Sequence, residues 1–163
     1  MNFKFFIPFS IIILTIAGCY KTPSYPVEPA ITFGGFEKDN DIYTLGDSGW
    51  MYIKFTDGDG DLGLATNSDS SHSSKLYIYN LKETTLLDTL NEIPKIPYKG
   101  TTVAIDGTIA VKLTSFLQEA SYQALFDLKG KTSDTFTYSI YITDRARHKS
   151  NTIITPEIII KKR

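Results

Sequence analysis

The sequence of 163 residues contains few of the side chains that most often build reactive sites. It has one cysteine, two histidines and one tryptophan. A single cysteine excludes an internal disulfide, and neither His72 nor His148 has a partner at zinc-ligand spacing, so we expect both to be ordinary surface residues. A Gly-x-Ser-x-Gly elbow and a glycine-rich phosphate loop are also absent from the sequence. We therefore predict that the chain is not an enzyme and has no catalytic residues.

The sequence also lacks an excess of one charge and a long apolar segment. Its 17 basic and 18 acidic side chains give a net charge of −1, which argues against nucleic acid as a partner. The apolar run Phe5–Ile16 is shorter than the roughly 20 residues that a membrane-spanning helix needs. Without a disulfide, the folded part must be stabilised by core packing, with help from a metal ion if one binds.

The N-terminus has the three parts of a secretory signal, namely Lys4, the apolar run and small residues before Cys19. The segment Leu14–Cys19 resembles the lipobox of bacterial lipoproteins. This resemblance implies cleavage after residue 18 and attachment of diacylglycerol and a further acyl chain, such as palmitate, to Cys19. Because no aspartate follows the cysteine directly, it also implies the outer membrane, with the leaflet left open. The alternative is an ordinary signal peptide with an unrelated cysteine.

These features divide the chain into three parts. Residues 1–18 form the signal peptide, residues 19–29 form the lipidated cysteine and a tether, and residues 30–163 form one β-sandwich domain. The tether contains Pro23, Pro26 and Pro29, which favour extended backbone. We expect it to hold the domain away from the bilayer.

The domain is rich in residues that favour strands. It is well supplied with tyrosine, phenylalanine, threonine and isoleucine. Apolar and polar side chains alternate over residues 51–56 and 136–143, which indicates antiparallel strands with one buried face. Residues 76–81 are apolar on both faces and suit a central strand. Residues 30–36 and 153–160 supply the first and last strands, and Pro156 confines the last one to an edge or a bulge.

About seven short strands separated by turn signals are typical of an immunoglobulin-like antiparallel β-sandwich, so the predicted fold class is all-β. The pair Asp106-Gly107 lies between apolar segments and predicts a tight hairpin. One short helix is predicted within residues 114–126, although residues 122–128 also fit a strand. Trp50 stands at the start of a strand and is predicted to belong to the core.

One loop carries a pattern with specific chemistry. Asp57, Asp59 and Asp61 alternate with glycines that let the backbone fold tightly, so that the three carboxylates converge. A hard cation with many oxygen ligands suits such a cluster and favours calcium over zinc. The triplet resembles the start of an EF-hand loop, but Leu62 replaces the glycine and Ser68 replaces the glutamate of that pattern. The alternative is a solvated acidic turn without a metal.

A second loop is expected at the same end of the sandwich. Residues 143–151 resemble the Asp-x-Ala-Gly-Asn-x-Ser loop of bacterial immunoglobulin-like domains, with Arg147 and His148 replacing Gly-Asn. If the strands before the two loops are B and F of that fold, Asp144 approaches the acidic triplet and is a candidate fourth ligand. Two alternatives stay open. Asp144 caps its own turn, or Arg145, Arg147 and Lys149 neutralise the triplet without a metal.

Together, the acidic loop, the late Asp-Arg loop and the final apolar strand resemble a group of Bacteroidetes-type lipoproteins of unassigned role. The resemblance implies a fold and a compartment but no activity. We expect a membrane-anchored, calcium-stabilised binding or accessory module whose partner is a glycan or an envelope protein. A structural subunit of an envelope complex is the alternative, and a hydrolase that uses the acidic loop is a minor one.

Overall fold

The computed structural model describes residues 24–38, 41–63, 73–82, 85–90, 93–94, 96, 104–113 and 120–163. The predicted signal peptide, Cys19 and His72 lie outside these ranges. The described elements, in chain order, are β1 (Ala30–Phe36), β2 (Ile42–Thr44), β3 (Trp50–Asp57), β4 (Lys75–Asn80), β5 (Thr85–Leu90), β6 (Ile105–Lys112), α2 (Ala120–Lys129), β7 (Ser133–Phe136), β8 (Tyr138–Thr143), β9 (Ile153–Ile154) and β10 (Ile158–Lys161). Within the described ranges, no helix is long and apolar enough to cross a membrane.

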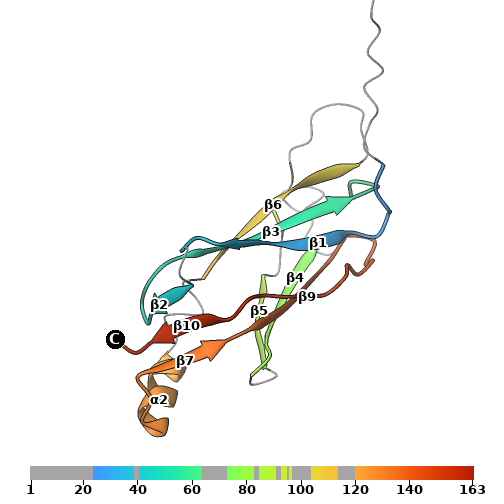
Figure 1. Ribbon diagram of the computed structural model, residues 1–163. Coiled ribbons are helices and arrows are strands. Elements are labelled where there is room, and N and C mark those ends of the chain that lie inside the picture. Colours follow the sequence, from blue (N-terminus) through green and yellow to red (C-terminus); the bar gives the residue numbers. More distant parts are fainter. Residues whose placement is uncertain are drawn as a thin grey trace, which may run out of the picture.

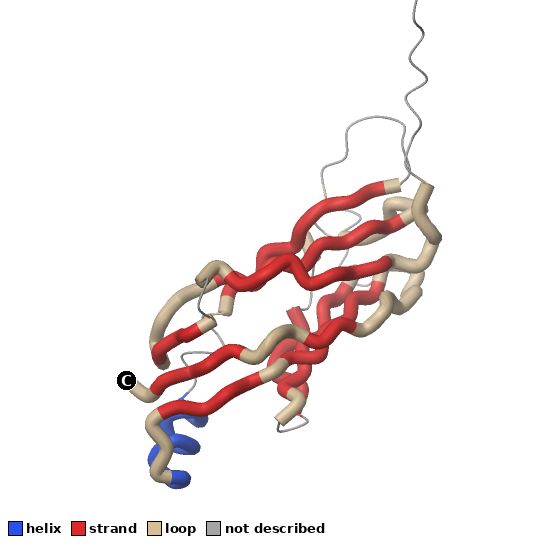
Figure 2. The backbone as a smooth tube through the Cα atoms, in the orientation of Figure 1, coloured by secondary structure: helices blue, strands red, loops and turns tan. Residues whose placement is uncertain are grey.

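The strands form two layers (Figures 1 and 2). One layer is the sheet β1-β3-β6, and the other contains the sheet β5-β4-β8-β9. The second layer continues in β2-β10-β7, because β7 leads directly into β8 and β9 leads into β10. This order matches strands A-B-E and C′-C-F-G of an immunoglobulin-like sandwich, and the predicted all-β fold class is confirmed. The described residues form ten strands instead of the seven predicted, because the expected hairpin is a single strand, β6, two predicted strands are each split in two, and β2 and β5 were not predicted.

The core lies between the two layers and follows the predicted alternation. Met51 and Ile53 of β3 are fully buried, whereas Lys54 between Ile53 and Phe55 is exposed. Likewise, Ile140 and Ile142 of β8 point inward and are fully buried. Each such side chain stabilises the fold by about 1.5–3 kcal/mol relative to its exposed state. The prediction of a central strand at residues 76–81 is also confirmed, because β4 lies between β5 and β8.

The predicted hairpin at Asp106-Gly107 is wrong. Both residues lie inside β6, which pairs with β3 over its whole length. Gly107 stands opposite Phe55, and a Cβ atom at Gly107 would lie only 3.0 Å from two atoms of the Phe55 ring. The glycine therefore makes room for an aromatic ring on the neighbouring strand and does not form a turn. A local turn signal is overridden here by a contact with a residue about 50 positions away in sequence.

Two further expectations are corrected in detail. Trp50 does begin β3, but it is 37% exposed and is not a core residue, because the inward positions of this strand start at Met51. The predicted short helix exists as α2, and it ends at Lys129, three residues later than predicted. The predicted start of that helix lies outside the described residues. Pro156 falls between β9 and β10 and so interrupts the predicted last strand: β9 lies at a sheet edge as expected, whereas β10 lies between β2 and β7.

Candidate metal centre

The acidic loop begins at the end of β3 and is fastened to the core by its own residues. Asp57 is the last residue of β3 and is fully buried. Its Oδ2 accepts a hydrogen bond of 2.8 Å from the backbone N–H of Leu62, whose side chain is itself buried in the core. Leu62 occupies the position at which an EF-hand has glycine. The loop is therefore closed by a core leucine, in a geometry of its own.

The far side of the loop is held by Ser74 and Pro94. The backbone N–H of Gly63 donates to the Ser74 hydroxyl at 2.8 Å, and Ser74 is fully buried. Gly63 has a φ of 98°, and a Cβ atom there would lie 2.7 Å from the Pro94 carbonyl oxygen. Both the positive φ and the close carbonyl require glycine at this position. The loop backbone is thus tightly constrained before any ion is considered.

The three aspartates converge as predicted. One ligand oxygen from each of Asp57, Asp59 and Asp61 lies within 4.8 Å of the others. In each carboxylate, Oδ1 is buried and has no hydrogen-bond partner among the described residues. A buried carboxylate oxygen without a partner is costly, because it has lost water and gained no donor. The three carboxylates, each of which has one such oxygen and one oxygen in the converging set, therefore form an acidic group that fits a metal ion.

Charge repulsion and burial both perturb this group. Burial raises the pKa of Asp57 to about 6, and the neighbouring charges of Asp59 and Asp61 add to this rise, while the Leu62 N–H opposes it. Burial also raises the pKa of Asp61, as do the charges of Asp144 and Asp59. The fold thus disfavours the charged triplet unless a positive charge is supplied.

Asp144 lies beside the triplet but serves its own turn. The side chain is buried, and its Oδ1 accepts a 2.7 Å hydrogen bond from the His148 backbone N–H. Its Oδ2 lies 2.8 Å from Nδ1 of the His148 ring. The turn touches the acidic loop through Asp61, whose Oδ2 accepts a 2.9 Å hydrogen bond from the Ala146 N–H. The two loops therefore meet at one end of the sandwich, as predicted, with Asp144 outside the converging group and capping its own turn.

The basic residues of this turn have different positions. Arg145 donates from Nη1 to the Gly63 carbonyl oxygen at 3.2 Å, and its positive charge partly opposes the rise in the pKa of Asp61. The ammonium group of Lys149 lies 3.9 Å from the centre of the Tyr141 ring, so it is engaged there. Arg147 adopts a φ of 72°, in the left-handed region that the glycine of the resembled loop would occupy without strain. Of the three residues Arg145, Arg147 and Lys149, Arg145 is the one whose charge is seen to act on Asp61.

The pair of Asp144 and His148 was missed at the sequence level. The hydrogen bond to Asp144, followed by its negative charge, raises the pKa of His148. The ring is thus a partner of a buried carboxylate and is more than an ordinary surface residue. The available signal was the spacing Asp-x-x-x-His across a turn, in which Arg147, the residue before His148, has a left-handed backbone.

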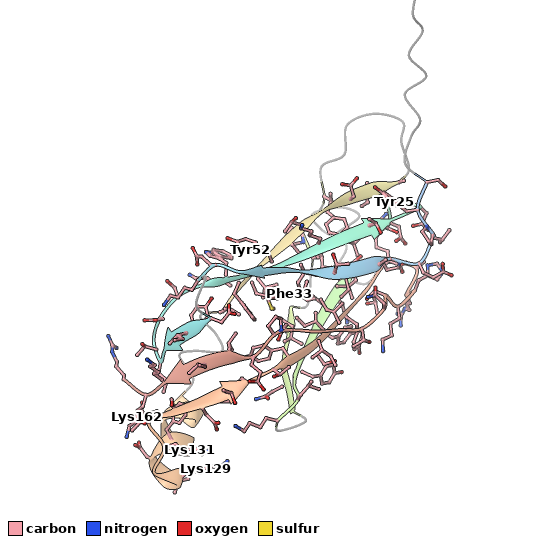
Figure 3. The ribbon with its side chains drawn as sticks, viewed as in Figure 1. Tyr25, Phe33, Tyr52, Lys129, Lys131 and Lys162 are labelled. Atoms are coloured by element: carbon pink, nitrogen blue, oxygen red, sulfur yellow. The ribbon has the colours of Figure 1, made fainter. Side chains whose placement is uncertain are left out.

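The chain reaches the domain at this same end. A Cβ atom at Gly58 would lie 2.3 Å from the Tyr25 carbonyl oxygen and 2.4 Å from the Pro26 carbonyl oxygen. Figure 3 shows Tyr25 at the end of the sandwich opposite α2. Pro29 is buried. Part of the predicted tether therefore packs against the acidic loop, and the contact depends on Gly58 having no side chain.

Comparison with known proteins identifies no relative in sequence: no protein-family model and no curated protein matches the chain. No family is assigned. Among solved structures, the chain is similar to a CARDB domain from Pyrococcus furiosus in complex with di-metal ions, with 7% identity and a TM-score of 0.34, covering 86% of this chain and 93% of that one. It is also similar to a Niemann-Pick type C2 protein from Japanese carpenter ant, with 12% identity and a TM-score of 0.36, covering 87% and 98%. Likenesses this loose carry no argument about the present chain.

Proposed function

We propose that the chain is a lipid-anchored protein of the cell envelope whose folded part is a calcium-stabilised immunoglobulin-like module for binding. The observation that carries this proposal is the convergence of three carboxylates, each with one buried oxygen that has no hydrogen-bond partner among the described residues, in a loop that glycine and core contacts hold in place. A cation would compensate both their lost hydration and their mutual repulsion.

The donor set favours calcium over other common metals. The converging atoms are all carboxylate oxygens, and no histidine or cysteine belongs to the group. Hard oxygen ligands select calcium or magnesium, and calcium tolerates irregular sites in which backbone carbonyls and water complete the shell. Asp57, Asp59 and Asp61 would hold the ion, which would supply positive charge and rigidity. A purely solvated turn is less consistent with three buried, unpaired oxygens.

The same geometry argues against hydrolysis. The ligand oxygens lie within 4.8 Å of one another. Acid and nucleophile or base pairs in glycoside hydrolases are separated by about 5–5.5 Å or about 6.5–9.5 Å, which leaves space for the scissile bond or a water molecule. Three carboxylates this close, all attached to one loop, are better suited to share a cation than to act from opposite sides of a substrate. We therefore favour a binding role over an enzymatic one.

The anchor is proposed from the sequence around Cys19, and one contact makes it consistent with the fold. Residues 25 and 26 pack on the acidic loop, so the segment that leads back to Cys19 leaves the domain beside the proposed calcium site. An anchored chain would then hold this end of the sandwich toward the bilayer.

Two measurements test this function. Isothermal titration of metal-free protein with calcium should show one saturable site in the range of about 0.1–1 mM, typical of extracellular modules. No heat of binding at millimolar calcium, or tighter binding of zinc, would contradict the calcium site. Mass spectrometry of protein from native membranes should show an acylated Cys19 as the first residue, and an unmodified N-terminus would contradict the anchor.

A further inference from the structure

A groove lies next to the metal centre, on the outer face of the second layer. Its volume is about 250 Å³, and its walls include Lys75 and Tyr77 from β4, Thr143 from β8, and Arg145 and Arg147 from the following turn. This volume is below the range of about 300–1,000 Å³ for pockets that enclose a drug-sized ligand. The groove therefore fits one ring-sized unit of a longer ligand, whose remainder would run over the open face of the sheet.

Tyr77 is the aromatic residue that lines the groove, and it belongs to a row of stacked tyrosines. Tyr77 and Tyr141 stand directly opposite each other on β4 and β8, and their rings stack with centroids 4.6 Å apart and planes 17° apart. Tyr79 stacks on Tyr141 with a centroid distance of 6.0 Å. All three rings are on the outer face, since the residues between them in sequence are core residues. Stacking on Tyr141 holds Tyr77 in place, so Tyr77 offers apolar ring surface to the groove at a small cost in side-chain entropy, which suits recognition.

The remaining walls are positively charged. Lys75, Arg145 and Arg147 contribute three positive groups, and the single negative group is Asp144, which is buried and bonded to His148. Lys149 lies close by on the Tyr141 ring. The groove is therefore positively charged, although the chain as a whole carries a net charge of −1. Concentrated positive charge at a concave site favours an anionic ligand.

From these observations we propose that the groove binds one uronate unit of a carboxylated glycan. The apolar face of the sugar ring stacks on Tyr77, and its carboxylate pairs with the guanidinium of Arg147, while Lys75 supports the negative charge. This proposal deepens the binding role proposed above and rests on it, but it does not require the calcium site.

Two features favour a glycan over an acidic peptide. Peptides bind to sandwiches most often by adding a strand to a free sheet edge, whereas this groove lies on the face of two paired central strands, β4 and β8. The ring of Tyr77 also matches the flat apolar face of a sugar ring. Arginine adds selectivity for carboxylate, because its planar fork donates hydrogen bonds to both oxygens at once.

The test uses microscale thermophoresis of the full folded domain with galacturonate oligomers, in saturating calcium and again in chelator. We expect binding that weakens with salt, and a loss of about tenfold in affinity, or about 1.4 kcal/mol, for both Tyr77→Ala and Arg147→Gly. Arg147→Gly removes the charge at a position where glycine tolerates the φ of 72°, and the melting temperature of the variant reports separately on its folding. Lys54→Ala, which removes an equal charge from the exposed face of the other layer, is the matched control and should change affinity less than twofold.

Methyl-esterified oligomers and polyglutamate peptide complete the panel. The proposal is overturned if the esterified oligomers bind equally well, if polyglutamate binds more tightly, if no probe binds at millimolar concentration, or if Arg147→Gly behaves as Lys54→Ala does. Calcium titration of the same protein reports separately on the metal centre, so failure of the groove and failure of the calcium site are distinguishable.

Discussion

Replacing Asp59 by asparagine should change the stability of the protein in opposite directions with and without calcium. Without calcium, Asp59 faces Asp57 and Asp61 with their oxygens within 4.8 Å. Two unit charges about 5 Å apart repel by about 1 kcal/mol in water-like surroundings and by about 3 kcal/mol at an effective dielectric constant near 20. Because Asp59 is only half-buried, we use the lower figure for each of its two neighbours. Asp59→Asn should therefore stabilise the calcium-free protein by about 2 kcal/mol.

With calcium the order should reverse. At 100 times its dissociation constant, a bound ion stabilises the wild-type protein by about 2.7 kcal/mol, or about 8–10 °C in melting temperature for a domain of this size. Losing one of three charged ligands should weaken binding by about 100-fold, which leaves the variant about 0.4 kcal/mol of calcium stabilisation at the same concentration. The wild type should thus gain several degrees in calcium and the variant almost none.

Differential scanning fluorimetry of both proteins, in 10 mM EDTA and in about 10–100 mM calcium chloride, measures the four melting temperatures that this comparison needs. Glu37→Gln is the matched control, because Glu37 is exposed, its backbone N–H donates to the Trp50 carbonyl at the other end of β3, and its replacement changes the net charge equally. If Asp59→Asn lowers stability in EDTA and the wild type does not respond to calcium, then Asp59 makes a structural contact and the loop is an ordinary turn.

Three further results are expected. In EDTA, the free energy of unfolding should fall as the pH rises from about 4 to 7. The folded pKa of Asp57 is about 6 against 3.8 ordinarily, so the folded state binds more protons than the unfolded state in that window. Urea titrations should show a loss of at most about 3 kcal/mol in the free energy of unfolding, and a rise would contradict the prediction. Arg147→Gly should raise stability by up to about 1 kcal/mol by relieving a left-handed φ, whereas a loss above about 1 kcal/mol in the same assay would show that the arginine stabilises the turn. Gly58→Ala should lower the melting temperature, because the added Cβ atom clashes with the carbonyl oxygens of Tyr25 and Pro26. Removing residues 24–28 should largely cancel that loss, and a loss that persists would show that the clash involves other residues.

The sequence predicted what depends on local pattern. The alternation around Met51 and Ile140 located the inward faces of β3 and β8, because a strand has only two faces and one of them must be buried. The Asp-Gly repeat predicted a tight loop with converging carboxylates, since the glycines let the backbone turn sharply between the aspartates. The placement of the second loop beside the first followed from the expected strand order alone.

What the sequence could not predict depends on contacts between distant residues. Gly107 has the local signal of a hairpin, and only the Phe55 ring on the neighbouring strand shows why a glycine stands in the middle of β6. The position of Tyr25 over Gly58 depends in the same way on where the chain enters the sandwich. The exposure of Trp50 could have been predicted from the sequence, because Trp50 and the inward-facing Met51 are neighbours and point to opposite faces of the strand. The prediction failed because it relied on the average tendency of large aromatic side chains to be buried.

The parallel pairing of β2 with β10 has a mechanical consequence. Three register pairs join these strands, from Ile42 opposite Ile159 to Thr44 opposite Lys161. Tyr25 and Lys162 lie at opposite ends of the sandwich (Figure 3). Tension applied between these two ends acts nearly along the strands, so the hydrogen bonds between β2 and β10 are sheared together and cannot be unzipped one at a time. A module held at a membrane on one side and by a bound partner on the other would resist extension in its strongest direction.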